Sequence, residues 1–367
     1  MDPKPISIAD LERIALAKLP KSTRDYYASG AEEEITLREN ITSLQRYRIV
    51  PRYLVDVGLD KLDSRSRPVW GKRQNVPFAV GPSAFHRLAG FDGELDVARA
   101  ASKRGISMGL SSSSTSSLED VIHAGTAVND WWYQLYVSSE RQDTEALVKR
   151  AEKAGYTALL ITVDRPYLGR RHTHLREKFE LPPHLRRDTG AKMAQDPSMH
   201  WDELIPWLRS ITSLKLLVKG ILHPEDALLA LLHGLDGIVV SNHGGRQLDA
   251  APATIDALPS IADVVQGRIP IFFDGGVRKG LDVFRALALG ADIVLLGRAV
   301  LWGLAANGEP GVGLALDIIT EEFKLVMALA GVTDISQIKR SALALVNPSQ
   351  IGLVRVEDAE WEDRRAW

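Results

Sequence analysis

Four segments of the chain share one pattern, in which helix-like spacing of apolar residues leads to a glycine and then to a short apolar run. The glycines are Gly105, Gly155, Gly234 and Gly290. A glycine just past a helix end can take the left-handed conformation that closes the last turn, and the β-branched run behind it is typical of a buried strand. Each segment is therefore predicted to be a helix followed by a strand.

The intervals between these segments add four further apolar runs, each followed by a helical pattern. The predicted strands lie within residues 77–80, 106–112, 131–137, 156–164, 215–219, 235–245, 270–273 and 291–298. Their apolar residues are nearly continuous rather than alternating, which is typical of parallel strands covered on both faces. Eight such units in series favour an α/β fold of the (β/α)8 TIM-barrel type over a doubly wound sheet.

The segments before and after the barrel are predicted to belong to the same single domain. Residues 1–75 form an N-terminal cap with helical patterns at Ile8–Lys18 and 21–30, and the barrel occupies about residues 76–331. The C-terminal segment 332–367 follows a helix at 311–330, and its tail from Asn347 shows no clear pattern. Residues 181–201 are polar and broken by prolines, so they are expected to form a mobile loop.

Composition narrows the class of protein. The 367 residues carry a formal net charge of −2, and 45% are hydrophobic, which is ordinary for a globular protein and speaks against a nucleic-acid partner. The absence of cysteine excludes disulfides, thiolate metal sites and cysteine nucleophiles. With no membrane-length apolar run, no signal-peptide pattern and no SKL-type peroxisomal address, a soluble, cytoplasmic protein without a membrane partner is expected.

Polar residues, together with a few small residues and a proline, lie at or directly after the ends of the predicted strands. Catalytic groups of TIM barrels lie at the carboxyl ends of the strands, so these residues are expected to converge on one mouth. They are Pro82, Ser83, Ala84, Ser111, Gln134, Tyr136, Thr162, Asp164, Lys219, Ser241, Asn242, His243, Asp274, Gly275, Gly276, Gly297 and Arg298.

Two of these ends are predicted to bind a phosphate. The sequences GGVR at 275–278 and GR at 297–298 each lead into a helix, whose N-terminus favours an anion. Arg278 and Arg298 can donate paired hydrogen bonds to phosphate oxygens. The alternative is that the glycines only form tight turns and the arginines are solvated.

His243 is the strongest candidate for a general base, because imidazole titrates near neutral pH. Asp164 at another strand end can orient it, and Arg246 can hold an anionic substrate. The alternative is a structural histidine. No metal site is indicated, and the following histidines are expected to be surface or loop residues: His86, His172, His174, His184, His200 and His233.

Lys219 admits two chemical roles. It is either a Schiff-base lysine, as in an aldolase, or a fixed cation beside an electron-accepting ring. A lysine that extends to solvent from the barrel end is the structural alternative. Tyr136 and Gln134 alone are equally consistent with packing and backbone capping.

Several ordered motifs resemble the FMN-dependent 2-hydroxy acid oxidase family, which includes glycolate oxidase, lactate oxidase, the flavin domain of flavocytochrome b2 and mandelate dehydrogenase. The resemblance covers nearly the whole chain, so chance similarity is negligible. The motifs are LPKSTRDYYASGAE at 19–32, GPSAF at 81–85, QLYV at 134–137, TVDRPYLGRR at 162–171, LVKGIL at 217–222, SNHGGRQLD at 241–249, FFDGGVRKGLDVF at 272–284, LLGRAVLWGLA at 295–305 and EEFKLVMALAGV at 321–332.

The resemblance implies a role for each candidate residue. His243 is similar to the active-site base and Asp164 to its partner, while Tyr136 corresponds to the tyrosine beside the substrate hydroxyl. Lys219 corresponds to the lysine near flavin N1 and O2, where a cation stabilises the reduced flavin. The substrate carboxylate is expected on Tyr26, Arg171 and Arg246. The other implied FMN contacts are Pro82, Ser83, Ala84, Ser111, Gln134, Thr162, Ser241, His243, Arg246 and, around the phosphate, Asp274, Gly275, Gly276, Arg278, Gly297 and Arg298.

One departure from the family pattern concerns substrate size. Glycolate oxidase-like members have a tryptophan in the motif after the second strand, where this chain has LSSSSTSS with Ser113. A serine leaves room for medium, branched or aromatic (S)-2-hydroxy acids, which the enzyme would oxidise to 2-oxo acids. The lack of a haem domain before the barrel and of an apolar membrane-binding insert favours O2 as acceptor with formation of H2O2, and the resemblance implies a homotetramer. The alternative is a 2-hydroxy acid dehydrogenase with a different acceptor, and both hydride transfer and a carbanion remain open.

Three other functions are compatible with parts of the sequence. A Schiff-base aldolase would use Lys219 and bind no flavin. A flavin-dependent isopentenyl diphosphate isomerase would bind FMN without net redox chemistry. A non-catalytic flavin-binding barrel is disfavoured by the complete set of base and carboxylate-binding residues.

Overall fold

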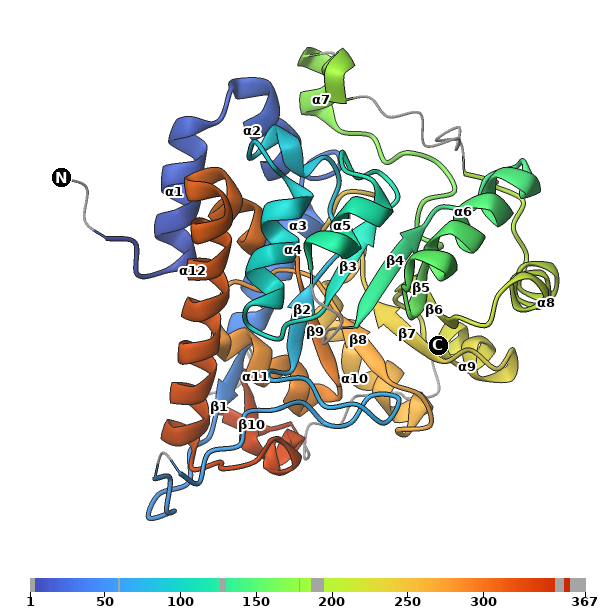
Figure 1. The fold of residues 1–367 in the computed structure, drawn as a ribbon. Helices are drawn as coiled ribbons and strands as arrows, with labels where there is room; N and C mark the ends of the chain where they lie inside the picture. Colours follow the sequence, from blue (N-terminus) through green and yellow to red (C-terminus); the bar gives the residue numbers. More distant parts are fainter. Residues whose placement is uncertain are drawn as a thin grey trace.

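The computed structural model describes residues 4–58, 60–125, 130–177, 179–185, 195–346 and 353–356. Eight parallel strands close into a barrel, and their order along the chain is also their order around it (Figure 1). The predicted (β/α)8 TIM barrel is therefore confirmed. The strands are β2 (Phe78–Val80), β3 (Met108–Ser111), β4 (Trp131–Leu135), β5 (Ala158–Thr162), β6 (Lys215–Ile221), β7 (Gly237–Val240), β8 (Ile271–Phe273) and β9 (Ile293–Leu296).

Helices surround the barrel, as Figure 1 shows. They are α4 (Glu94–Ser102), α5 (Leu118–Ala124), α6 (Arg141–Ala154), α7 (His172–Glu177), α8 (Trp201–Ile211), α9 (Pro224–Leu232), α10 (Thr254–Val265), α11 (Gly280–Leu289) and α12 (Arg298–Ala330). The four glycines that mark the helix-to-strand turns have φ angles of 63°, 103°, 65° and 120° in chain order. These angles are the left-handed conformation that the sequence pattern predicted.

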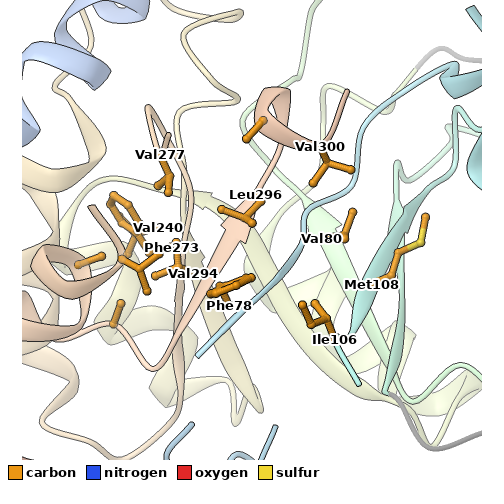
Figure 2. Packing of buried hydrophobic residues seen from close by; sticks show 14 of the residues in the cluster. Phe78, Val80, Ile106, Met108, Val240, Phe273, Val277, Val294, Leu296 and Val300 are labelled. Carbon is orange, nitrogen blue, oxygen red and sulfur yellow. The ribbon is translucent and has the colours of Figure 1, made fainter. Parts of the chain in front are cut away.

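The strands bury both faces, which explains their continuous apolar runs. Alternate residues point into the barrel, where Trp132, Leu160 and Phe272 belong to one buried cluster. The residues between them point outward into a second cluster under the helices. Figure 2 shows Phe78 of β2 and Leu296 of β9 within this outer cluster. Both faces of each strand therefore contribute to the core.

The end of the barrel opposite the carboxyl ends of the strands is closed by a short turn from the segment before β2. Val69 and Lys72 form an isolated antiparallel bridge, and Trp70 packs with its ring centroid 5.8 Å from that of Phe272. The Trp70 indole donates a hydrogen bond to the carbonyl of Asp236, one residue before β7. A segment predicted only as a polar connector thus seals the base of the barrel.

The first helices of the N-terminal cap pack against different parts of the protein. Helix α1 (Ile8–Lys18) lies beside α12 and buries Ile8, Leu11 and Ala15 (Figure 1). Helix α2 (Lys21–Ala28) instead contacts α7, and α3 (Ile35–Thr42) follows it. The cap is therefore anchored by α1 while α2 brings its side chains to the barrel mouth.

A small second sheet joins distant parts of the chain. Strand β1 (Tyr47–Ile49) pairs antiparallel with β10 (Leu343–Val346), which pairs in turn with β11 (Leu353–Arg355). The sequence pattern did not reveal this sheet, because each strand is short and its partner lies far away in sequence. Residues 186–194 of the expected mobile loop, 347–352 and 357–367 lie outside the described residues.

Candidate active site

The carboxyl ends of the barrel strands surround a cavity of about 330 Å³. All the predicted site residues line it except Asp164 and Ser241, which lie directly behind the lining. The cavity also reaches Ser113. The fold therefore brings together residues from positions 26 to 298 in one site.

His243 has a partner on each side of its ring. Its Nδ1 donates to Asp164 Oδ1 at 2.8 Å, because a carboxylate can only accept. The Tyr136 hydroxyl lies 3.3 Å from Nε2. In the neutral ring this arrangement places the lone pair on Nε2, which faces the cavity. Nε2 can therefore take a proton from a group bound beside Tyr136.

The charges of this pair follow from burial and contact. Burial lowers the pKa of His243 below its ordinary value, although Asp164 acts in the opposite direction. Burial raises the pKa of Asp164, but the His243 and Lys219 charges outweigh it and leave that pKa lowered. The site at neutral pH thus holds a neutral imidazole beside a carboxylate, which is the protonation state that a general base requires.

The backbone at His243 is in the left-handed region, with φ of 58°, and Gly244 and Gly245 after it have φ of 65° and 73°. A left-handed conformation is uncommon for a residue with a Cβ and is found mainly where the surroundings impose it. The backbone N–H of His243 donates to Ser241 Oγ, and that of Gly245 to the Asn242 carbonyl. The tight turn directs the imidazole across the mouth toward β5 and Asp164.

Two arginines and a tyrosine form the predicted carboxylate site. The Arg246 guanidinium lies 5.0 Å from the Tyr26 ring centroid and donates to the carbonyls of Tyr26 and Ser29. Arg171 donates to the Arg246 carbonyl at 3.3 Å. Burial, and then the Arg246 charge, lower the pKa of Arg171 to about 9. Two neighbouring cations without an acidic partner among the described residues make a site for an anion.

Lys219 is held by a short polar chain. Its ammonium donates to Ser241 Oγ at 2.7 Å, the Ser241 hydroxyl donates to Asp274 Oδ1, and the ammonium lies 3.3 Å from Asp274 Oδ2. Burial opposes the charge, but Asp274 and Asp164 outweigh it and raise the pKa of Lys219. A Schiff-base lysine needs a lowered pKa to be a free amine. The geometry therefore favours the fixed cation over the aldolase alternative, and Asp274, which also lines the cavity, is the acidic partner of Lys219.

A second polar chain crosses three adjacent strands. Ser111 of β3 donates to Gln134 Oε1 at 3.1 Å, and Gln134 Nε2 donates to Thr162 Oγ1 of β5 at 2.9 Å. All three side chains are buried and line the cavity. They present amide and hydroxyl groups along one wall of the cavity, which Pro82, Ser83 and Ala84, the residues after the neighbouring strand β2, also line.

Arg278 and Arg298 are partly buried cations that fit an anionic group. Arg298 donates to the backbone carbonyls of Tyr27, Ser29 and Gly244, and Arg278 to that of Val277. Neither forms an ion pair among the described residues. Burial lowers the pKa of both side chains, and for Arg298 the neighbouring arginines lower it further. A phosphate bound between them would relieve this cost.

The glycines of this site have a structural requirement of their own. A Cβ on Gly276 would lie 1.9 Å from the carbonyl oxygen of Asn40, and φ there is 76°. Gly276 is therefore required by a tight turn, and it also lines the cavity wall. The predicted phosphate site rests on the two arginines more than on the glycines.

The expectation for the other histidines was wrong at two positions. His86 is buried, and its backbone N–H donates to the buried carboxylate of Glu94, which also accepts hydrogen bonds from Thr115 and Ser116. His174 lines the cavity and stacks on Tyr26, with ring centroids 5.3 Å apart. Both depend on contacts between distant segments, which spacing along the chain does not show.

Sequence reasoning also missed the contribution of the segment after β5. Arg165, Leu168, His174 and Phe179 all line the cavity, although only Arg171 was predicted from this segment. Phe179 stacks on Tyr26 at 4.5 Å between ring centroids. Their position in the sequence could have identified them, because residues that follow a barrel strand contribute to the mouth, and this strand is followed by Asp164.

The fold and site together define a class. A TIM barrel whose mouth joins a general base, a site for a carboxylate and a buried site for a phosphate is suited to a cofactor-dependent enzyme of small acids. The sequence profile of the family described as FMN-dependent dehydrogenase matches residues 15–345. The chain therefore belongs to the FMN-dependent dehydrogenase family, and its cofactor is FMN.

Individual relatives agree with this assignment. The chain is 46% identical to 2-hydroxyacid oxidase 1 of Homo sapiens over 96% of its own length and all of that protein, and 44% identical to glycolate oxidase of Spinacia oleracea over 92% and 95%. Among solved structures, a mandelate oxidase with 3,3-difluoro-2-hydroxy-3-phenylpropionic acid aligns with a TM-score of 0.87 at 39% identity, covering 94% of this chain and all of the other. A soluble mutant of the membrane-associated (S)-mandelate dehydrogenase from Pseudomonas putida gives 0.87 at 36%, covering 93% and 99%. In this chain, no described helix has the length and apolar character to cross a bilayer.

Proposed function

We propose that this enzyme oxidises (S)-2-hydroxy acids to 2-oxo acids, passes the electrons to O2, and accepts side chains larger than the hydrogen of glycolate. The oxidation of 2-hydroxy acids agrees with the activity named for its relatives. One observation carries the assignment of the chemistry. His243 Nε2, with Asp164 on the opposite nitrogen at 2.8 Å, opens into the same cavity as Arg171 and Arg246.

The residues divide the work as follows. Arg171, Arg246 and Tyr26 bind the substrate carboxylate, which places the 2-hydroxyl group near Tyr136 and His243. His243 Nε2 takes the hydroxyl proton, and Asp164 stabilises the resulting imidazolium through Nδ1. The Tyr136 hydroxyl orients the substrate oxygen beside Nε2.

The cofactor is held by the other side of the cavity. Arg278 and Arg298 would bind its phosphate, Lys219 would face the electron-rich edge of its ring, and Ser111, Gln134 and Thr162 would offer hydrogen bonds. When bound, FMN supplies a two-electron acceptor that O2 reoxidises with formation of H2O2. The raised pKa of Lys219 keeps a positive charge available there.

Ser113 supports the preference for larger substrates. It lines the cavity, and a serine occupies far less of this space than the tryptophan of glycolate oxidase-like sequences. A structural relative accommodates an aryl-substituted hydroxy acid in a barrel of the same fold. Side chains of medium, branched or aromatic character therefore fit the proposal better than glycolate.

The experiment is the visible spectrum of the purified enzyme before and after anaerobic addition of single (S)-2-hydroxy acids. Bleaching of the flavin absorbance, fastest with a substrate larger than glycolate, supports the proposal. Highest kcat/KM with glycolate would contradict the substrate preference alone. Reduction without subsequent O2 consumption on admission of air would favour the alternative, a dehydrogenase with another acceptor.

We also propose that the enzyme assembles as a homotetramer. Leu325 and Leu329 are exposed near the end of α12, and Tyr53 and Leu54 are exposed close to them, since the N–H of Arg52 donates to the Ala330 carbonyl. Clustered exposed apolar side chains are typical of subunit contacts. Light scattering after size-exclusion chromatography measures the assembly directly, and a monomer would contradict the proposal.

A further inference from the structure

Arg165 is a cation of the cavity that the proposed mechanism does not use. It directly follows Asp164, lines the cavity, and lies with its guanidinium 4.5 Å from the centroid of the Tyr136 ring. Within the described part of the chain, this stacking is its only contact of note, because no hydrogen bond or ion pair reaches the guanidinium. No described residue therefore uses the five N–H donors of this guanidinium at the edge of the substrate site.

The other cations of the cavity are already committed. Arg278 and Arg298 lie together at the proposed phosphate site, and Lys219 is paired with Asp274 at 3.3 Å. Arg171 and Arg246 are adjacent at the proposed site of the substrate carboxylate. A substrate with a single carboxylate leaves Arg165 without a counterion among the residues that the structure describes.

Two neighbouring side chains report the excess of positive charge. Arg171 has its pKa lowered to about 9 by burial and by Arg246, with a further contribution from Arg165. His174, stacked on Tyr26 in the same cavity, has its pKa lowered to about 4 by burial and by the Arg171 and Arg246 charges. Arg165, Arg171 and Arg246 repel one another electrostatically. A single bound carboxylate would offset only part of this repulsion.

We propose that Arg165 binds a second carboxylate at the far end of the substrate side chain, so that dicarboxylic 2-hydroxy acids are the preferred substrates. This inference rests on the proposed function, because it assumes that Arg171 and Arg246 hold the first carboxylate. The small Ser113 leaves space for the intervening methylene groups. A planar guanidinium can receive both oxygens of a carboxylate, which makes the recognition specific.

A purely structural role for Arg165 makes a different prediction. If its stacking only positions Tyr136, its loss disturbs the hydroxyl that lies 3.3 Å from His243 Nε2. All substrates would then lose kcat to the same degree. Recognition of a distal carboxylate instead affects the KM of diacids and leaves the kcat of different substrates in proportion.

The experiment compares (S)-2-hydroxyglutarate with (S)-2-hydroxy-5-methylhexanoate, in which an isopropyl group replaces the distal carboxylate. Malate and 2-hydroxyadipate extend the series by varying the spacer. In the FMN-loaded wild-type enzyme, kcat/KM is expected to be higher for one of the diacids than for the monoacid. In Arg165→Leu, the ratio of diacid to monoacid kcat/KM is expected to fall about 10- to 100-fold, mainly through the diacid KM, because a charged hydrogen-bond pair is lost.

Two further variants control the comparison. Arg165→Lys retains the charge and is expected to recover part of the diacid preference. Arg176→Leu removes an exposed arginine of α7 that does not line the cavity, and is expected to leave the ratio as in the wild type. The flavin spectrum of each variant confirms that the site has folded.

Three results would overturn the inference. A wild-type preference for the monoacid shows that no distal carboxylate is recognised, while the proposed function stands. An equal loss of kcat for both substrates in Arg165→Leu assigns the residue to positioning of Tyr136. Flavin reduction by no 2-hydroxy acid at all removes the proposed function and this inference with it.

Discussion

The interior of the barrel and its mouth are built from the same strands but follow opposite rules. Inside, uncharged side chains such as Trp132 and Phe272 pack with ring centroids 4.9 Å apart, and every member of the cluster is buried. At the mouth, the strands end in charged groups such as the buried Lys219 and the partly buried Arg298. The interior stabilises the fold through apolar packing. At the mouth, desolvation of the charged side chains costs free energy, and bound anions offset this cost. Substitutions in the barrel interior are therefore expected to affect mainly stability, and substitutions at the mouth mainly activity.

The largest effect is expected at the mouth. His243→Ala removes the base, so flavin reduction by a 2-hydroxy acid should slow by roughly 10²- to 10⁴-fold, with a further loss as Asp164 becomes unpaired. FMN should remain bound, since the phosphate site and Lys219 are untouched. Stopped-flow absorbance under anaerobic conditions measures the rate. A variant that reduces its flavin at the wild-type rate would remove His243 from the mechanism.

In the interior, Phe272→Ala is expected to act on stability instead. The ring is fully buried between Trp70 and Trp132, and such truncations cost about 3–5 kcal/mol of unfolding free energy. Urea unfolding monitored by circular dichroism gives the value. The folded, FMN-loaded fraction should keep a kcat close to that of the wild type. A large loss of kcat without loss of stability would break the proposed separation.

Arg278→Met tests the cost of buried charge at the mouth. The substitution removes a partly buried cation whose one side-chain hydrogen bond among the described residues is to a neighbouring carbonyl. FMN affinity should fall about 10- to 100-fold, because a charge-assisted contact with phosphate is lost. The apo-protein should be as stable as the wild type or more stable, as measured by thermal unfolding with and without FMN. Unchanged FMN affinity would place the phosphate elsewhere.

The smallest expected effect is a shift in pH dependence. The base must be neutral, so kcat/KM should fall as the pH drops through the pKa of His243, and burial places that midpoint below the ordinary value of 6.5. Asp164→Asn removes the group that raises this pKa, so the midpoint should move to still lower pH while the rate falls. A pH series of kcat/KM checks both. A midpoint that rises in the variant would contradict the assigned pair.

Much of the barrel was predictable from local pattern. A strand covered on both faces needs apolar residues at every position, and a helix that returns to the sheet needs a left-handed glycine such as Gly155. Both requirements are written in a few consecutive residues. The candidate residues at strand ends followed from the same argument, since parallel strands of a barrel share one mouth.

Contacts between distant segments were not predictable in the same way. Trp70 lies in a polar connector and seals the barrel base, β1 pairs with a strand near the end of the chain, and His174 reaches Tyr26 across the mouth. Each depends on the position of a partner far away in sequence. His86 and His174 were expected to be surface or loop residues because no motif spacing accompanies them, which was wrong.

The sequence by itself therefore determined the barrel, the family and the chemical types at the mouth, because apolar periodicity, glycine conformation and strand ends are local properties. The tertiary structure decided how those types are used. In the folded chain the Asp274 carboxylate pairs with Lys219, and His243 Nε2 lies beside the Tyr136 hydroxyl. The Arg165 guanidinium lies over the Tyr136 ring. Charge, burial and the protonation state of a side chain are set by the groups around it in space, and only the folded chain brings those groups together.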